Sequence, residues 1–272
     1  MHNTVISKAA AHFSSYQLAE ILSHCFEGYL VPFTIDGKAF ASRFAAEDMS
    51  LNDSRVWMQN DEPKALAIIS RRGQSCRLAA FAIRPELRGQ GFGRQFMQQL
   101  IDEAKARGDR NMWLEVIAGN DSGLALYERM GFVRQNTFVG FYATSPARFI
   151  ATNELTEVDP LMVAKKMMAD THLRLPWLSG GETLFKLPGQ AFSLQDAAYA
   201  MVVTAPYLRL RMLYVDPAAR GKGLAKKLLM LLRERFPGIA TAAAIPEQMS
   251  PLFLSCGYRQ DPITQYEMLL KL

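Results

Sequence analysis

Hydrophobic positions recur at helical spacing in two long segments of the chain. In the first segment, apolar residues stand four positions apart: Phe92, Phe96, Leu100 and Ala104. In the second segment the same pattern returns 132 positions later: Leu224, Leu228, Leu232 and Phe236. Apolar residues that are spaced four positions apart lie on one face of an α-helix. We therefore predict helices over residues 91–107 and 223–236.

The remaining pattern predicts strands alternating with helices in both halves. Further helices are expected over 14–26, 36–46, 121–130 and 161–169. In the first half, strands are expected over 54–59, 64–70, 78–83 and 112–117, followed by two closing strands that end near 143. In the second half, strands are expected over 198–203, 208–215, 239–244 and 265–270. This alternation indicates an α/β class with a mixed sheet in each half.

The two helical segments belong to a longer internal repeat. Residues 81–93 match residues 213–225, so that Arg88 corresponds to Arg220. Further along, Met130-Gly131-Phe132 has a counterpart in Cys256-Gly257-Tyr258 at an offset of 126, which makes the second copy shorter. A repeat of this length indicates two similar units. We expect a boundary at the turn-forming Ser145-Pro146 pair, giving domains at 1–145 and 146–272.

The composition agrees with two globular domains and limits the classes of ligand that the protein is expected to bind. The chain has 272 residues, of which 49% are hydrophobic and 21% charged, and a net charge of +5. This mild basic excess favours an anionic small ligand, and the absence of long basic runs argues against nucleic acid. Three cysteines without a CxxC pair and four scattered histidines indicate neither disulfides nor a metal site. No apolar leader or membrane-length run is present, so we expect a soluble, cytoplasmic protein.

A glycine-rich turn precedes both long helices and carries the strongest chemical signal. The first turn reads Arg-x-x-Gly-x-Gly over Arg88–Gly93, and the second reads Arg-x-x-Gly-x-Ala over Arg220–Ala225. Such a turn exposes backbone N–H groups at the positive end of a helix, where phosphates bind. A nucleotide-hydrolase loop would need GxxxxGK before Ser or Thr, and a dinucleotide fingerprint would need glycine in place of Arg94.

This spacing resembles the acyl-CoA loop of the GNAT superfamily of N-acetyltransferases. The resemblance implies two tandem GNAT-like domains, each a twisted mixed β-sheet flanked by helices, with acetyl-CoA as cosubstrate. It implies that loop amides hold the CoA diphosphate and that a strand splayed from its neighbour binds the pantetheine arm. The residues it assigns to the cofactor are Phe81, Ala82, Ile83, Arg88, Gly89, Gln90, Gly91, Phe92, Gly93, Arg94 and, further on, Asn120. Plain core packing is the alternative for the strand, and a solvated surface arginine for Arg88.

A second signature of the same family follows in the first half only. Glu115 lies on an expected strand, and Tyr127 precedes Gly131-Phe132. By the resemblance, the Tyr127 hydroxyl points at the thioester sulfur, where a phenol can protonate the leaving thiolate. The spacing of Glu115 to Tyr127 is similar to that of ribosomal-protein alanine N-acetyltransferases, in which the glutamate is the base. A core aromatic and a solvated carboxylate are the alternatives, with Glu47 and Asp48 as other bases.

The second half departs from the signature at both catalytic positions. Counting back from Gly257 as from Gly131, Pro246 replaces Asn120 and Phe253 replaces Tyr127. Phenylalanine has no proton to give, so this domain is expected to be catalytically degenerate. Its glycine loop is retained, which leaves CoA binding by this half open.

These observations favour an N-acetyltransferase that moves an acetyl group to a primary amine of a small molecule or peptide N-terminus. The alternative is a non-catalytic acyl-CoA-binding, regulatory or scaffold protein. We expect no metal, no nucleic acid and no membrane partner, and either a monomer or a homodimer. Four aromatic residues are candidates for an apolar acceptor pocket, although such spacing is also typical of core: Phe26, Tyr29, Phe33 and Trp57.

Overall fold

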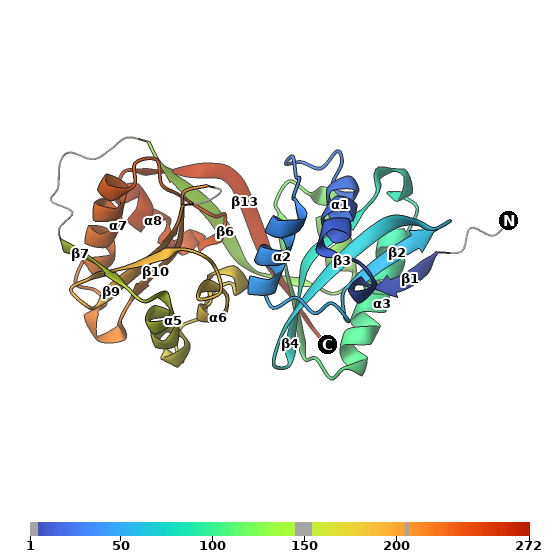
Figure 1. The fold of residues 1–272 in the computed structure, drawn as a ribbon, viewed down its shortest axis with the longest axis horizontal. Helices are drawn as coiled ribbons and strands as arrows, with labels where there is room; N and C mark the ends of the chain where they lie inside the picture. Colours follow the sequence, from blue (N-terminus) through green and yellow to red (C-terminus); the bar gives the residue numbers. More distant parts are fainter. Residues whose placement is uncertain (1–4, 145–153, 205–206) are drawn as a thin grey trace. The chain divides into compact units, whose positions relative to one another are not determined.

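The computed structural model describes residues 5–144, 154–204 and 207–272, which divide into two compact units (Figure 1). The first unit comprises Met1–Gln135 together with Tyr266–Leu272, and the second comprises Asn136–Gln265. The expected turn at Ser145-Pro146 lies outside the described residues. The units differ from the expected domains because the end of the last strand belongs to the first unit.

The first unit is a mixed sheet with helices on both faces. Its strands are β1 (Ile6–Ala9), β2 (Arg55–Gln59), β3 (Glu62–Arg72), β4 (Ser75–Ile83) and β5 (Asn111–Ile117). They pair in that order, antiparallel except for β4 with β5, and the end of β13 (Tyr258–Lys271) follows β5. Its helices are α1 (Ser15–Cys25), α2 (Gly37–Ala46), α3 (Phe92–Ala106) and α4 (Asp121–Arg129). The expected mixed α/β class is confirmed.

Two apolar clusters, one on each face of this sheet, hold the helices in place. Helices α3 and α4 pack on one face, and α1 and α2 cover the other (Figure 1). Trp57 lies in the α3 cluster, where it is almost fully buried and stacks on Phe96 with ring centroids 4.4 Å apart. Its indole nitrogen donates to Gln99 Oε1 at 2.9 Å. Trp57 is therefore a core residue, and its expected place in an acceptor pocket is wrong.

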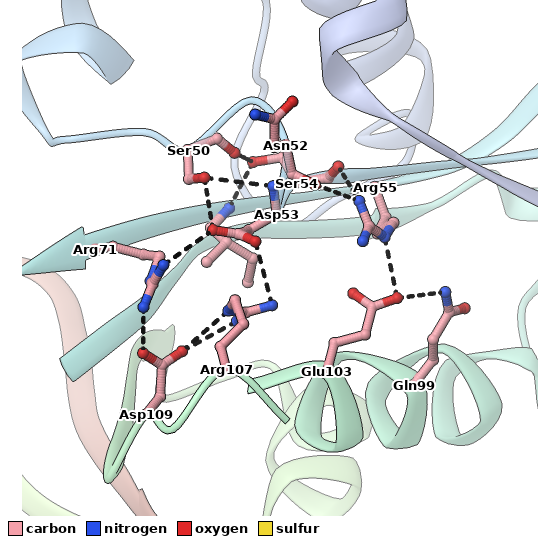
Figure 2. A network of polar contacts seen from close by, with 11 residues as sticks. Ser50, Asn52, Asp53, Ser54, Arg55, Arg71, Gln99, Glu103, Arg107 and Asp109 are labelled. Atoms are coloured by element: carbon pink, nitrogen blue, oxygen red, sulfur yellow. Dashed lines mark hydrogen bonds and ion pairs between the residues drawn. The ribbon is translucent and has the colours of Figure 1, made fainter. Parts of the chain in front are cut away.

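A polar network fixes the C-terminal end of α3 (Figure 2). Asp109 is almost fully buried and accepts from Arg71 at 2.8 Å and from Arg107 at 3.1 Å. The same two arginines reach Asp53, at 3.5 and 3.4 Å, in the turn before β2. Buried charges that are paired on all sides restrict side-chain geometry. The network thus ties α3 to β3 at the end of the helix remote from the glycine turn.

The last strand of the chain completes the core of the first unit. Met268 of β13 is fully buried in the cluster beneath α3. The N–H of Leu272 donates to the carbonyl of Arg110 at 3.0 Å. The guanidinium of Arg134 lies over the ring of Tyr266, 4.4 Å from its centroid. Residues 266–272 are therefore part of the first unit although they are the furthest from it in sequence.

The second unit repeats the plan with shorter elements. Its strands are β6 (Val133–Ala143, from residue 136), β7 (Leu155–Val158), β8 (Gln190–Leu194), β9 (Ala198–Val203), β10 (Arg209–Val215), β11 (Ala240–Thr241), β12 (Ile245–Pro246) and the first half of β13. The order is β13-β6-β11-β10-β9-β8-β7, with β12 beside β6 and β10 parallel to β11. Its helices are α5 (Pro160–Ala169), α6 (Gly181–Leu184), α7 (Leu224–Arg235) and α8 (Ser250–Ser255).

Three strand expectations need correction. The two closing strands before residue 143 are one continuous strand, β6. The strand expected over 239–244 shrinks to Ala240–Thr241, because the Thr241 hydroxyl accepts the N–H of Phe141 at 2.9 Å in place of a backbone carbonyl. The final strand begins at Tyr258 rather than near 265.

Among the described segments, no helix has both the length and the apolar character that a membrane crossing requires.

Candidate active site

Strand β4 parts from β5 halfway along its length. The two strands pair from Ser75 opposite Asn111 to Leu78 opposite Leu114, and no further. Directly afterwards Ala79 is an extra residue in the ladder with β3, forming a β-bulge. Bulges bend a strand and increase its twist. Residues 81–83 consequently keep β3 on one side and present backbone N–H and C=O groups on the other.

The turn after β4 presents a set of backbone donors. Gly89 and Gly91 have φ of +76° and +85°, a region that side chains other than glycine enter only with strain. Gly91 is the N-cap of α3. The N–H groups of residues 89–93 meet no acceptor among the described residues. Together with the helix dipole they form a binding site for an anion such as a diphosphate.

The Arg88 side chain holds this turn in place. Its Nε donates to the carbonyl of Ile83 at 2.9 Å. Its Nη2 donates to the carbonyls of Cys25 and Glu27 at 2.9 and 2.8 Å, at the end of α1. Arg88 therefore joins the strand, the turn and the first helix. Arg94 is exposed on the first turn of α3 and lines the cavity there, so its guanidinium could meet a ligand's phosphates.

A cavity of about 670 Å³ opens beside the parted strands and the turn. It brings together ten of the residues assigned from the sequence: Phe81, Ala82, Ile83, Arg88, Gly89, Gly91, Gly93, Arg94, Asn120 and Tyr127. Three further residues are outside its lining. Gln90 donates to the carbonyl of Glu86 at 2.6 Å, Phe92 packs on Phe96 at 5.6 Å, and Glu115 belongs to a separate cluster of charges.

Tyr127 is the buried phenol of the cavity. It lies on α4 with only 8% of its surface exposed, and its ring meets Phe132 edge-on at 5.8 Å. Burial raises the pKa of the Tyr127 hydroxyl above its ordinary value, and the nearby phenol of Tyr29 raises it further. The hydroxyl therefore keeps its proton at neutral pH and is present as a hydrogen-bond donor.

Asn120 positions the helix that carries Tyr127. It is the N-cap of α4, where its Oδ1 accepts the N–H of Gly123 at 3.0 Å. Its Nδ2 donates to the Tyr29 hydroxyl at 3.4 Å. Burial also raises the pKa of Tyr29. Tyr29 and Phe26 both line the cavity, in agreement with two of the four expected aromatic residues.

No sequence signal identified Tyr29 as a polar partner of Asn120. The two residues are 91 positions apart, and Tyr29 lies in an irregular segment after α1. An aromatic residue in such a segment indicates packing rather than chemistry. The structure adds its hydroxyl to the site.

Glu115 belongs to a buried cluster built around Arg77. Arg77 is 3% exposed and donates to Glu115 Oε2 at 2.7 Å and to Glu47 Oε2 at 2.7 Å. Burial alone would raise the pKa of the Glu47 carboxyl, but the Arg43 and Arg77 guanidiniums outweigh it and hold that pKa below its usual range. Asp48, the other alternative base, accepts from Arg72 at 2.7 Å.

The parted strands, the turn of free amides and the buried phenol define a transferase of the acyl-CoA type. The sequence model of the Acetyltransferase (GNAT) family matches residues 16–132. The [Ribosomal protein bS18]-alanine N-acetyltransferase of Escherichia coli is 31% identical over 121 residues, covering 43% of this chain and 82% of that protein. The chain belongs to the GNAT acetyltransferase family, whose cosubstrate is acetyl-CoA.

Solved structures extend the likeness to both units. The tandem GNAT protein from the clavulanic acid biosynthesis pathway has a TM-score of 0.64 at 16% identity, covering 98% of each chain. The GCN5-related N-acetyltransferase from Sphaerobacter thermophilus has a TM-score of 0.70 at 16% identity, covering 98% of this chain and 95% of that one. At this identity the likeness shows the fold. It confirms the expectation of a tandem member.

Proposed function

We propose that the first unit moves the acetyl group of acetyl-CoA to a primary amine of a small molecule or a peptide N-terminus. One observation supports this most directly. A single cavity is lined by Gly89, Gly91 and Gly93 of the turn with free amides, by the open strand edge of residues 81–83 and by Tyr127. These are the groups that the diphosphate, the pantetheine amides and the thioester sulfur of one acetyl-CoA require.

The residues fit the cosubstrate from one end to the other. The amides at the α3 N-terminus and the Arg94 guanidinium take the diphosphate, because both favour negative charge. The backbone of Phe81–Ile83 pairs with the pantetheine amides as a further strand would. Asn120 holds α4, and so the Tyr127 hydroxyl, against the thioester end. Two reactants aligned in this way gain much of their acceleration from orientation alone.

Transfer proceeds by direct attack of the amine on the thioester. The nitrogen lone pair forms a bond to the carbonyl carbon, and the carbonyl oxygen becomes negatively charged beside a backbone N–H of the open β4 edge. The carbon–sulfur bond then breaks, its electron pair goes to sulfur, and the proton of Tyr127 follows. The tyrosinate regains a proton from the new amide nitrogen through water. The products are an N-acetyl amide and CoA with a free thiol.

Proton transfer from Tyr127 depends on the burial of the leaving group. A free thiol has a pKa of about 8.5, below that of an ordinary phenol, so donation would be uphill in water. In the cavity the thiolate is desolvated as well, which raises its basicity in the same direction. The phenol thus acts first as a hydrogen-bond donor and releases its proton as the carbon–sulfur bond breaks.

Glu115 is our proposal for the base that removes a proton from the incoming ammonium. Arg77 engages Oε2, so we assign proton uptake to Oε1, with water linking it to the amine. Arg77 orients this carboxylate and is itself held by Glu47. The proton then passes to solvent, which balances the reaction of a protonated amine.

The acceptor side favours a peptide as the first class to test. The Escherichia coli relative carries in its name an alanine of ribosomal protein bS18, and the family model that matches this chain spans residues 16–132, within the unit that holds the cavity. Leu30 is 57% exposed and lines the same cavity, which offers an apolar surface to the first side chain of a peptide.

The test is a transfer assay with a defined acceptor panel. The full chain is incubated with acetyl-CoA and peptides that begin with Ala, Ser or Met, or with small diamines, and release of free thiol is followed. Mass spectrometry then locates the added acetyl group. We expect acetylation of a free amine and none of peptides whose N-terminus is formylated.

Thiol release without any acetylated amine would contradict the proposal, because it would make water the acceptor. Acetylation of internal lysines in formylated peptides would support acetyl transfer to an amine. It would contradict the proposal that this amine is a peptide N-terminus.

A further inference from the structure

The second unit contains its own cavity, of about 620 Å³, against the turn that repeats Arg88–Gly93. We propose that this cavity is a second acyl-CoA site, which holds a thioester with an apolar acyl chain longer than acetyl and does not transfer it. The proposal stands independently of the transfer proposed for the first unit. It rests on three features of the second cavity: its anion-binding end, its strand edge and its apolar wall.

The anion-binding end repeats the first one in backbone geometry. Gly221 and Gly223 have φ of +76° and +79°, and Gly223 is the N-cap of α7. The N–H groups of residues 221–225 meet no acceptor in the described part of the chain. The exposed Lys226 takes the position of Arg94 and lines the cavity. Five free amides and a cation match the charge of a diphosphate.

The strand edge is repeated as well. Arg211 forms a bulge in the ladder between β10 and β9, 132 positions after the bulge at Ala79. Strand β10 pairs with β11 only at Arg209 and Leu210, which leaves the backbone of residues 213–215 open toward the cavity. Nε of Arg220 donates to the carbonyl of Val215 at 3.0 Å, as Arg88 does to Ile83. A pantetheine arm can therefore pair with this strand.

The wall opposite the strand is where the two cavities differ. In the first cavity it includes the polar run Asn120–Gly123. In the second cavity most of the wall is apolar, with Leu173, Leu175, Ile245, Met249, Leu252 and Phe253, although Arg174, Ser179 and Gln248 also line it. An apolar chamber at the thioester end is stabilised by burying methylenes and gains little from an acetyl group. The occupant that fits is a CoA thioester with a medium-length fatty acyl chain.

The chamber lacks the groups that would release this chain. Phe253 is 1% exposed and stacks on Phe141 at 4.5 Å, so the position that corresponds to Tyr127 carries no hydroxyl. Pro246 stands in place of Asn120 and has no N–H. A thioester bound here keeps its carbon–sulfur bond, because Phe253 cannot supply the proton that Tyr127 offers to a leaving thiolate in the first cavity.

Calorimetric titration of the full chain, without any amine, tests the proposal. The ligands are CoA, acetyl-CoA and octanoyl-CoA, and the protein carries Gly91→Val so that the first turn is distorted. We expect one equivalent of octanoyl-CoA to bind at least about tenfold more tightly than acetyl-CoA. Addition of Gly223→Val should abolish this binding. Absence of octanoyl-CoA binding in Gly91→Val, or its survival in the double variant, would overturn the proposal.

Two surface variants separate loss of the site from loss of the fold. Lys226→Glu introduces no backbone strain and should weaken all three ligands, because the diphosphate meets a negative charge. Met249→Glu, at a side chain that is 37% exposed, should weaken octanoyl-CoA at least about tenfold and leave CoA unchanged. Equal affinities for CoA and octanoyl-CoA in the parent would refute the apolar chamber. Because no amine is present, failure here is distinct from failure of acetyl transfer.

Discussion

The two cavities share a backbone and differ in the wall that faces it. Both contain a bulged strand, an open edge, an arginine bonded to the last strand carbonyl and two glycines with positive φ. Only the first adds Tyr127, together with an asparagine that fixes the helix carrying it. On our two proposals, anion binding and group transfer are thus separable properties of this fold. The first depends on main-chain geometry, and the second on one helix.

The largest expected effect comes from distorting the shared backbone in the first unit. Gly91→Val forces a β-branched residue into φ near +85°, where it is strained, and the amides of the turn lose their common direction. We expect kcat/KM for acetyl transfer to fall by about 1000-fold, measured by thiol release.

Gly108→Val is the matched control for this strain. Gly108 lies just beyond the other end of α3, has φ of +81° and has no atom within 4 Å of an added Cβ, as is true of Gly91. It should lower the melting temperature comparably and leave kcat/KM within a few fold. Equal loss of transfer in both variants would mean that strain on α3, rather than the turn, explains the effect.

The next effect tests the phenol that distinguishes the two walls. Tyr127→Phe should lower kcat about 100-fold, because the leaving thiolate loses its proton donor, and should leave the KM for acetyl-CoA unchanged. Steady-state kinetics measure both values.

The reciprocal change, Phe253→Tyr, sharpens the comparison. It puts a phenol at the corresponding position of the second unit and should not restore transfer to the Tyr127→Phe variant, since Pro246 cannot supply the amide of Asn120. Restored turnover would show that one hydroxyl is enough to convert a binding cavity into a catalytic one.

A third effect concerns the buried charges of the first unit. The pKa of Glu47 is held below its usual value in the folded protein, although burial opposes this, so its stabilising contribution is complete above pH 4.5 and is lost as the pH falls through the lowered pKa. Glu47→Gln should lower the free energy of unfolding by about 2 kcal/mol at pH 7 and flatten its dependence on pH below 4.5.

Hydrogen exchange shows whether this loss stays within the first unit. Amides of β4 should exchange faster in Glu47→Gln, and amides of β10 should not change. Acceleration in both strands would contradict a local role for the Arg77 cluster.

The smallest expected effect is at Tyr29. Tyr29→Phe removes the acceptor for Asn120 Nδ2 and should lower kcat/KM by roughly fivefold, the value of one neutral hydrogen bond. Tyr16→Phe on α1, at a side chain that is 63% exposed, is the control and should have no effect. Loss of stability without loss of kcat/KM in Tyr29→Phe would make Tyr29 a structural residue only.

Local features of this molecule were predictable from the sequence, and for a physical reason. The helices α3 and α7, the strands before them and the turns between them follow from apolar periodicity and glycine placement, which act over a few residues. The internal repeat provided a second sequence for the same strand, turn and helix, and so supported the prediction of each. The cavity of the first unit duly brings ten of the assigned residues together.

Features that depend on distant partners were not predictable in the same way. The role of the Arg88 side chain required knowing that the carbonyls of Cys25 and Glu27 lie beside it. An arginine is usually exposed, but Arg77 is buried between two carboxylates. The early start of β13 was not predicted, because Pro262 lacks the backbone N–H that a strand residue donates to its neighbour and therefore argues against a strand.

The place of residues 266–272 in the first unit has a consequence for synthesis of the protein. A ribosome makes residues 1–135 first, and that nascent segment exposes the unpaired edge of β5 and a vacancy where Met268 packs. This segment remains incompletely folded while about 130 further residues are translated. Its unpaired strand edge can pair with a wrong strand during that time. The core of the first unit is complete only once residue 268 and its neighbours have left the exit tunnel. A product terminated before residue 266 would therefore lack part of this core even though it carries every residue that lines the first cavity.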